Sequence, residues 1–266
     1  MFYGLVSGEI SYPGYTFLHD LSDIESLNQR ALRGELEVTA VSVHAYAYLQ
    51  GRYLIMNSGA SMGGKDYGPK LVVKKGQSLP TGRSVKIAIP GIYTSAALAL
   101  KIYLREKGIS ADLHAIDFNK VQDVVLTGEF DAGVIIHEGQ LTHEREGLHT
   151  VVDLGVWWWN ETELPLPLGI NIVRKDIGAE AIKASSDVLK RSILYSLAHR
   201  KESLTYALKY GRGIDVKEAD TFVGMYVNER TVDLGEEGRR SIRLFLERGL
   251  KHKLIPEGVE IEFVKE

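Results

Sequence analysis

Stretches with the period of an amphipathic helix alternate with short strand-like runs along the whole chain. Asp23–Gly34 carries its apolar residues on one helical face, and Gly34 is a typical helix stop. The run Glu37–Ser42 (EVTAVS) then predicts a short strand. Such alternation is typical of parallel sheets covered by helices, and it predicts the α/β class.

A break that contains proline and glycine divides the first strands from a second series. Two strands are predicted at Tyr53–Met56 and Leu71–Val73, on either side of the glycine-rich stretch Gly59–Gly68. Leu79–Arg83 (LPTGR) then interrupts the regular pattern. The series that follows is expected to form one lobe, with strands at Val85–Ile89, Ala111–Ala115, Ala132–Ile136, Val151–Leu154 and Gly169–Val173, and helices from Thr94 and over Lys120–Leu126.

The last third of the chain is almost entirely helical in its pattern. The predicted helices are Val188–Ala198, Lys201–Tyr210, Lys217–Val227 and Glu236–Leu250. Because these helices are too many to cover the middle lobe alone, we expect the chain to return to the first lobe. This predicts a two-lobed fold with mixed sheets, in which residues 1–82 and 175–266 form lobe one and residues 83–174 form lobe two. Two crossings leave a hinged cleft, which is a favoured site for a small molecule.

The composition excludes several kinds of chemistry. Hydrophobic residues make up 44% of the chain and charged residues 25%, as in ordinary globular proteins. The net charge of -3 gives no broad attraction to phosphate backbones, so we expect no nucleic-acid partner. The chain contains no cysteine, which excludes disulfides, thiolate metal sites and a cysteine nucleophile.

The sequence also bears on location. No apolar run approaches the roughly 20 residues that a membrane-spanning helix needs. Met1–Ile10 lacks the basic start and apolar centre of a secretory signal. We therefore expect a cytoplasmic protein without a membrane span, whose oligomeric state the sequence leaves open.

Hydroxyl groups gather where two predicted strands end. Thr94 and Ser95 stand at the start of an apolar helix, where unpaired N–H groups and the helix dipole suit a carboxylate or phosphate. Thr94 could equally act only as a helix cap. Ser42 closes a strand of lobe one, and its hydroxyl is expected to face Thr94 and Ser95 across the cleft.

The strand in DAGVIIHE (131–138) ends at His137. An imidazole at the carboxyl end of a parallel strand is placed to act as a general base. A lone histidine is more often structural, so the pattern alone leaves both interpretations open.

The spacing of the histidines argues against a metal site. His137, His143 and His149 recur every six residues, whereas a metal-binding helix needs ligands at positions i and i+4. The glycines after Ser58 match neither a phosphate-binding loop nor a dinucleotide fingerprint. We therefore expect neither a metal nor a nucleotide cofactor.

An aromatic run and a proline-rich run precede the last predicted strand. Trp157, Trp158 and Trp159 cannot all face one way on a helix, so one or two could line the cleft while another packs in the core. The stretch LPLPLG (164–169) is stiff and suits the entry to a strand or an active-site wall. Packing is the simpler interpretation of both runs.

Several motifs together resemble one known family. The sequence contains DIESLNQRALRGELEVTAVSVHAYAYL, RYLIMNSGASMGGKDYGPKLV, IPGIYTSAALAL, DAGVIIHEGQLTH, VVDLGVWWWNETELPLPLGINIVRKD and YVNERTVDLGEEG. As a set they are similar to the 1,4-dihydroxy-6-naphthoate synthase family of the futalosine route to menaquinone. The resemblance extends from about residue 2 to about residue 250.

The resemblance implies a fold, a reaction and a set of site residues. It implies a type II periplasmic-binding-protein-like fold and a lyase that needs no cofactor, which cleaves cyclic dehypoxanthine futalosine, a small carboxylate, to release 1,4-dihydroxy-6-naphthoate. It also implies that His137, in the IIHE motif, is the general base. The expected substrate contacts are Val41, Ser42, Ser58, Thr94, Ser95 and Ala96.

One departure from the family concerns the first residues. Relatives have an additional strand and a Ser-Pro-Cys-Pro-Asn-Asp-Thr type of turn before the helix that corresponds to Met1–Gly8. We expect either that the natural protein starts upstream of Met1 or that another segment takes the place of this strand in lobe one.

Two other functions compete with the naphthoate synthase. Chorismate dehydratase of the same pathway shares the fold, but the LPLPLG and IIHE segments favour the synthase. A solute-binding protein would close on a small anion without changing it. A histidine at the cleft counts against that alternative, and turnover distinguishes the two.

Overall fold

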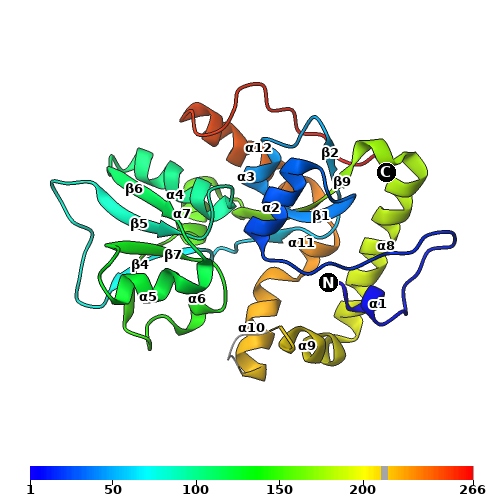
Figure 1. The fold of residues 1–266 in the computed structure, drawn as a ribbon, viewed down its shortest axis with the longest axis horizontal. Helices are drawn as coiled ribbons and strands as arrows, with labels where there is room; N and C mark the ends of the chain where they lie inside the picture. Colours follow the sequence, from blue (N-terminus) through cyan, green and yellow to red (C-terminus); the bar gives the residue numbers. More distant parts are fainter. Residues whose placement is uncertain (211–214, 266) are drawn as a thin grey trace.

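The computed structural model describes residues 1–210 and 215–265, which form two sheets covered by helices (Figure 1). The lobe-one sheet has β9 (Pro167–Arg174) at its centre. β1 (Val38–Ser42) pairs with it on one side, and β2 (Tyr53–Ile55) and β3 (Ser61–Met62) pair with it as well. All three pairings are antiparallel.

The lobe-two sheet has the strand order β6-β5-β7-β4-β8. Its parallel part places β5 between β6 and β7, and its antiparallel part places β4 between β7 and β8. The predicted mixed sheets are thereby confirmed. The strands are β4 (Lys70–Lys74), β5 (Val85–Ile89), β6 (Ala111–Ala115), β7 (Ala132–Ile135) and β8 (Leu148–Asp153).

The three longer helices of the first two thirds, α2 (Ile24–Arg33), α4 (Ser95–Glu106) and α7 (Leu154–Thr162), begin at side-chain caps that the sequence provides. The Asp23 carboxylate accepts the Ser26 N–H at the start of α2, and Gly34 ends this helix with a left-handed φ of 73°. Thr94 caps α4 in the same way. The other helices in this part are α1 (Tyr3–Val6), α3 (Val43–Tyr46), α5 (Val121–Leu126) and α6 (Gly139–Thr142).

The last third returns to lobe one as a series of helices. α8 (Ala179–Ala198) packs against α1 and lies along the side of the lobe-one sheet, and α9 (Arg200–Leu208) and α10 (Val216–Tyr226) continue from it toward lobe two (Figure 1). α12 (Gly235–Lys251) lies on the opposite side of the sheet. α11 (Glu229–Val232) lies between α10 and α12 along the chain. None of the helices in the described part of the chain is long and apolar enough to cross a membrane.

Strand pairing differs from the lobe boundaries expected from the sequence. The strand predicted at Leu71–Val73 was expected in lobe one, but β4 pairs with β7 and β8 of lobe two. The strand predicted at Gly169–Val173 was expected in lobe two, but β9 is the centre of the lobe-one sheet. Hydrophobic periodicity identifies a strand without identifying its partner, so it could not reveal either exchange.

A single core connects the two sheets. It contains Val41 and Ile170 of the lobe-one sheet together with Ile87 and Val134 of the lobe-two sheet. Side chains of α4, α7 and α12 fill the space between them. The two lobes are therefore joined by buried apolar contacts in addition to the connecting segments.

Candidate active site

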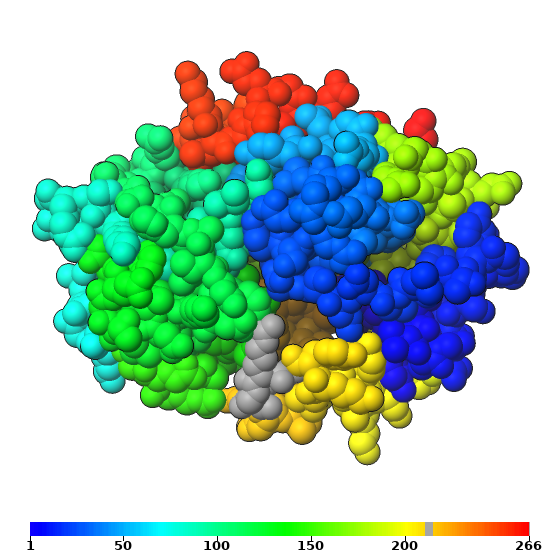
Figure 2. Space-filling model, viewed as in Figure 1, coloured from blue at the N-terminus to red at the C-terminus, as the bar shows by residue number. Residues whose placement is uncertain are grey.

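A cavity of about 580 Å³ lies between the lobes and contains His137. Lobe two contributes Phe118, His137 and Glu138 to its wall. The opposite wall comes from residues 21–24 before and at the start of α2, and from side chains of α9 and α10. Figure 2 shows the surface hollowed between lobe two, the segment around α2 and the helices that follow α8. This is the cleft that the two crossings of the chain predict.

His137 follows β7, as the sequence predicts, and its ring reaches the cavity. The ring centroids of His137 and Phe118 lie 4.3 Å apart in an edge-to-face arrangement. The Gln140 N–H donates a hydrogen bond of 2.8 Å to the His137 carbonyl oxygen. An imidazole held at a strand end beside a cavity is placed to exchange a proton with a bound molecule.

A buried polar seam joins lobe one to lobe two next to this cleft. We call it the interlobe seam, and it is formed by Asn28, Ser42, His44, Thr94 and Ser95. The Ser42 N–H donates to the Asn28 Oδ1 at 2.8 Å, and the Asn28 Nδ2 donates to the Ser42 Oγ at 3.2 Å. Asn28 is completely buried, so this pair of bonds satisfies groups that water cannot reach.

His44 connects the lobe-one part of the interlobe seam to the start of α4 by hydrogen bonds. The backbone N–H of His44 donates to the Ser95 Oγ at 3.3 Å, and the ring Nδ1 donates to the Thr94 carbonyl oxygen at 3.2 Å. Burial lowers the pKa of His44 to about 4, and the positive charge of Lys101 adds to this effect. The imidazole is therefore neutral at neutral pH, and it acts as a hydrogen-bonding group rather than a charge.

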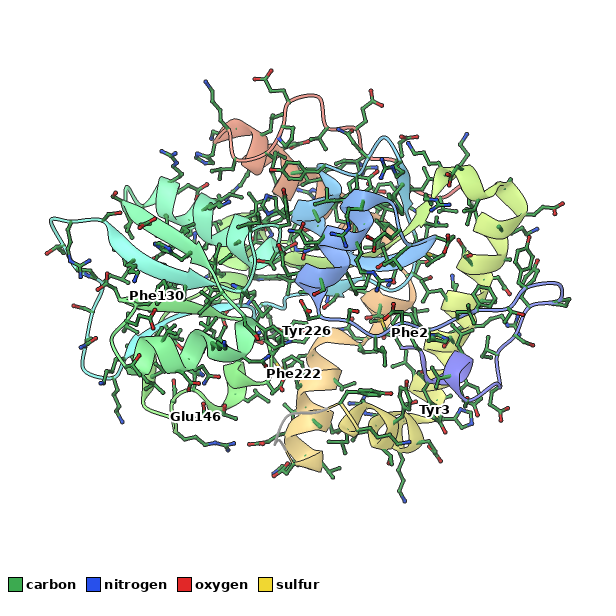
Figure 3. The ribbon with its side chains drawn as sticks, viewed as in Figure 1. Phe2, Tyr3, Phe130, Glu146, Phe222 and Tyr226 are labelled. Carbon is green, nitrogen blue, oxygen red and sulfur yellow. The ribbon has the colours of Figure 1, made fainter. Side chains whose placement is uncertain are left out.

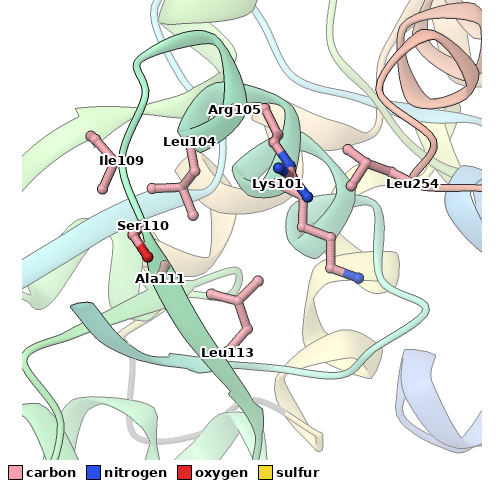
Figure 4. Close-up of a pocket in the computed structure, with 8 residues that line it drawn as sticks. All are labelled: Lys101, Leu104, Arg105, Ile109, Ser110, Ala111, Leu113 and Leu254. Carbon is pink, nitrogen blue, oxygen red and sulfur yellow. The ribbon is translucent and has the colours of Figure 1, made fainter. Parts of the chain in front are cut away.

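Lys101 belongs to a different depression, on the outer side of lobe two. Figure 4 shows Lys101 and Arg105 projecting from α4, with Leu113 of β6 and Leu254 beside them. The depression has a volume of about 340 Å³ and shares no lining residue with the His137 cavity.

The hydroxyls at the start of α4 form internal bonds. The Thr94 Oγ1 accepts the Ala97 N–H at 3.2 Å and donates to the Gly91 carbonyl at 2.9 Å. The Ser95 Oγ donates to the Leu168 carbonyl at 2.6 Å. Both side chains are buried, so in this structure they hold the seam together rather than face open solvent.

The residues expected at the site lie in three places. Val41, Ser42, Thr94, Ser95 and Ala96 come together at or beside the interlobe seam, all of them buried. His137 lies in the cavity. Among the described residues that line this cavity, none is one of the six expected substrate contacts.

Ser58 lies apart from the other expected contacts. Its hydroxyl donates to the Val232 carbonyl at 2.7 Å, and the residue lines a separate groove of about 730 Å³ beside α8. The structure therefore does not bring Ser58 to the His137 cavity.

The tryptophan run packs mainly inside the protein. Trp157 contacts the ring of Tyr103, and Trp158 contacts the ring of Phe245 of α12. Trp157 and Trp158 are buried, and the described lining of the His137 cavity contains no tryptophan. Stacking of this run on a ligand in the cavity is thus not supported, and the packing interpretation holds for Trp157 and Trp158.

Sequence reasoning missed the cavity wall that faces His137. The aromatic surface of this wall comes from Tyr206 of α9, from Tyr210 just after α9, and from Phe222 of α10. The helices themselves were predicted, but hydrophobic period gave no indication of which side faces a ligand. Asn28 did have a signal, because it is a polar residue on the otherwise apolar face of α2.

Comparison with known proteins identifies the family and the fold. The family model described as menaquinone biosynthesis matches residues 1–251. A curated protein of Thermus thermophilus named 1,4-dihydroxy-6-naphthoate synthase is 38% identical, over 94% of this chain and 90% of that protein. A protein of the same name from Streptomyces coelicolor is 32% identical, over 88% of this chain and 83% of that protein.

Solved structures show the same architecture. Protein AF1704 from Archaeoglobus fulgidus is 37% identical, with a TM-score of 0.89 over 96% of this chain and 93% of that one. A Candida albicans protein described as having the generic periplasmic binding protein fold is 10% identical, with a TM-score of 0.61 over 91% of this chain and 84% of that one. The chain therefore has the periplasmic-binding-protein-like fold that the resemblance implies.

Proposed function

The chain belongs to the menaquinone biosynthesis family, and from this premise we propose the reaction that it catalyses and the residue that acts as base. Its relatives named 1,4-dihydroxy-6-naphthoate synthase make it an enzyme of menaquinone biosynthesis. The proposed reaction is cleavage of cyclic dehypoxanthine futalosine to release 1,4-dihydroxy-6-naphthoate. The proposal includes a cytoplasmic location, because its relatives are biosynthetic enzymes by name.

The main support for this proposal is the position of His137. The imidazole stands at the carboxyl end of β7 and opens onto the cavity between the lobes. A base in this position can remove a proton next to a carbonyl group of a bound substrate and so start ring opening. Proton transfer by a positioned side chain contributes roughly 10²- to 10⁴-fold to a rate.

The proposed carboxylate anchor is the N-terminus of α4, which is buried at the interlobe seam in this structure, so a substrate reaches it only when the two lobes separate. The Thr94 and Ser95 hydroxyls bond internally, and the Ala97 N–H donates to the Thr94 Oγ1, so the backbone N–H groups of Ser95 and Ala96 are the donors that we assign to the substrate. These groups and the helix dipole favour a negative charge. Tyr206, Tyr210 and Phe222 offer flat surfaces for the aromatic part of the substrate from the opposite wall.

The decisive experiment follows naphthoate release from cyclic dehypoxanthine futalosine by chromatography. We expect release by the unmodified protein and a rate at least roughly 100-fold lower for His137→Ala. The matched control is His149→Ala, which removes an exposed histidine of β8 outside the cavity and should leave the rate unchanged.

Other outcomes point to other functions. Equal rates for the unmodified protein and His137→Ala would show that another group is the base. Binding of the substrate without chemical change would favour a solute-binding protein, and dehydration of chorismate instead would favour the second enzyme of the same fold.

A further inference from the structure

The main chain behind His137 is held by the short helix α6. Its residue Gln140 donates a backbone hydrogen bond to the His137 carbonyl, and the Gln140 carbonyl accepts a bond of 3.2 Å from the Lys70 Nζ of β4. Gln140 is only 2% exposed. The placement of the imidazole therefore depends on where α6 lies, and the side chain of Gln140 points into the protein rather than to solvent.

The partner of this buried side chain comes from the other lobe. The Tyr226 hydroxyl, at the end of α10, donates a hydrogen bond of 2.9 Å to the Gln140 Oε1. Figure 3 shows Tyr226 and Phe222 on α10 on the side that faces lobe two. Burial raises the pKa of Tyr226, so the phenol stays protonated and remains a donor.

Tyr226 is itself held in place by aromatic neighbours. The Tyr67 and Tyr226 rings meet edge to face with centroids 5.4 Å apart, and the Phe222 ring lies 5.1 Å from Tyr226. The Tyr67 hydroxyl also donates to the Met225 carbonyl of the same helix end. Ala219, Phe222 and Val223 of α10 line the His137 cavity. The phenol is thus held in a fixed position at the end of the helix that forms part of the cavity wall.

The Gln140 side chain depends on this contact. Its Nε2 is buried and has no hydrogen-bond partner among the residues that the structure describes, so the Tyr226 hydroxyl supplies the hydrogen bond observed for the amide. Arg145 and Glu218 form a second bridge between the same parts of the two lobes, at 2.7 Å, but the Arg145 side chain is 61% exposed. Water can replace this outer bridge, whereas it cannot reach the buried amide.

We propose that Gln140 and Tyr226 are positioning residues that tie the placement of His137 to the closure of the two lobes. When α10 meets α6, the phenol fixes the amide, the amide fixes the turn behind His137, and the imidazole takes its working position. When the lobes separate, the Gln140 side chain loses this partner and the turn is free to shift. This inference rests on the proposed function, because it takes His137 as the base.

The test is Tyr226→Phe, which removes the hydroxyl and keeps the ring that packs against Tyr67. We expect kcat to fall about 10-fold, with KM within about 2-fold of the unmodified value, because small misplacement of a catalytic group affects the chemical step. The control is Glu218→Gln, which breaks the outer bridge on the same helix and should leave both constants unchanged.

A double-mutant cycle that combines Tyr226→Phe with Gln140→Leu tests whether the two side chains act together. If the two side chains act together, the double variant loses no more than about 2-fold beyond the worse single variant. If the losses in kcat of the two single variants multiply in the double variant, or if Tyr226→Phe keeps full kcat, the inference is overturned. The proposed function would still stand in that case, provided that the unmodified protein is active and His137→Ala has lost most of its activity. Absence of turnover by the unmodified protein overturns both.

Discussion

At the scale of single residues, Asn28 joins α2 to the end of β1. Its amide bonds both the backbone and the hydroxyl of Ser42, and its Nδ2 also donates to the Glu25 Oε2 at 3.2 Å. Ser42 in turn precedes His44, which bonds to the start of α4. A single side chain of α2 therefore sets the lobe-one half of the interlobe seam.

Asn28→Leu should lower the free energy of unfolding by about 1–3 kcal/mol, because it leaves the buried Ser42 N–H without a partner. Chemical denaturation measures this loss directly. Gln29→Ala on the same helix removes only a partly exposed bond to Glu25, so its effect should stay within about 0.5 kcal/mol. Equal effects of the two substitutions would contradict the role given to Asn28.

At the scale of elements, the segment around Tyr67 and Gly68, where the chain first passes from lobe one to lobe two, packs directly against the start of α7. Asp153 caps this helix by accepting the N–H groups of Gly155 and Val156. A Cβ atom added at Gly155 would overlap the Tyr67 carbonyl oxygen and the Gly68 Cα. Two glycines from distant parts of the sequence thus allow two backbones to touch where the chain passes from lobe one to lobe two.

Gly155→Ala should destabilise the protein by about 1–3 kcal/mol or more, since the added atom meets backbone that cannot turn away. The matched control is Gly51→Ala, because a Cβ at Gly51 meets no atom within 4 Å. Thermal unfolding of both variants measures the difference. A Gly155→Ala protein as stable as the control would mean that the crossing can move aside.

At the scale of the whole molecule, the lobes share one core although they form separate sheets. Trp158 of α7 contacts Phe245 of α12 with ring centroids 5.4 Å apart, so a helix that follows the lobe-two sheet packs on a helix of lobe one. The same core includes strands of both sheets. Any movement of the lobes must therefore leave this side closed and open the side that holds His137.

The shared core predicts a single cooperative unfolding transition. Calorimetry should give one peak whose calorimetric and van't Hoff enthalpies agree, because unfolding of either sheet disrupts the core cluster that both sheets share. Two resolved transitions would show that the lobes are independently stable, and would remove the reason for treating them as one body.

Local pattern was enough to predict most of the elements. α2 begins after its cap Asp23 and ends at Gly34, as expected. Two strands were also predicted at the residues where they occur, Val85–Ile89 and Ala111–Ala115. These predictions succeeded because caps, glycine stops and hydrophobic period act over a few neighbouring residues. The position of His137 at a strand end followed from the same local evidence.

The sequence by itself therefore determined the α/β class, the two-lobed fold and the family, and it singled out His137 as the candidate base. Only the tertiary structure decided that β4 and β9 exchange sheets, that Ser58 lies apart from the cleft, and that α9 and α10 form the wall opposite His137. The hydrogen bond from Tyr226 to Gln140 belongs to this second group, since it joins residues 86 positions apart. Such contacts depend on which surfaces meet after folding, and hydrophobic period carries no information about the partner of a surface.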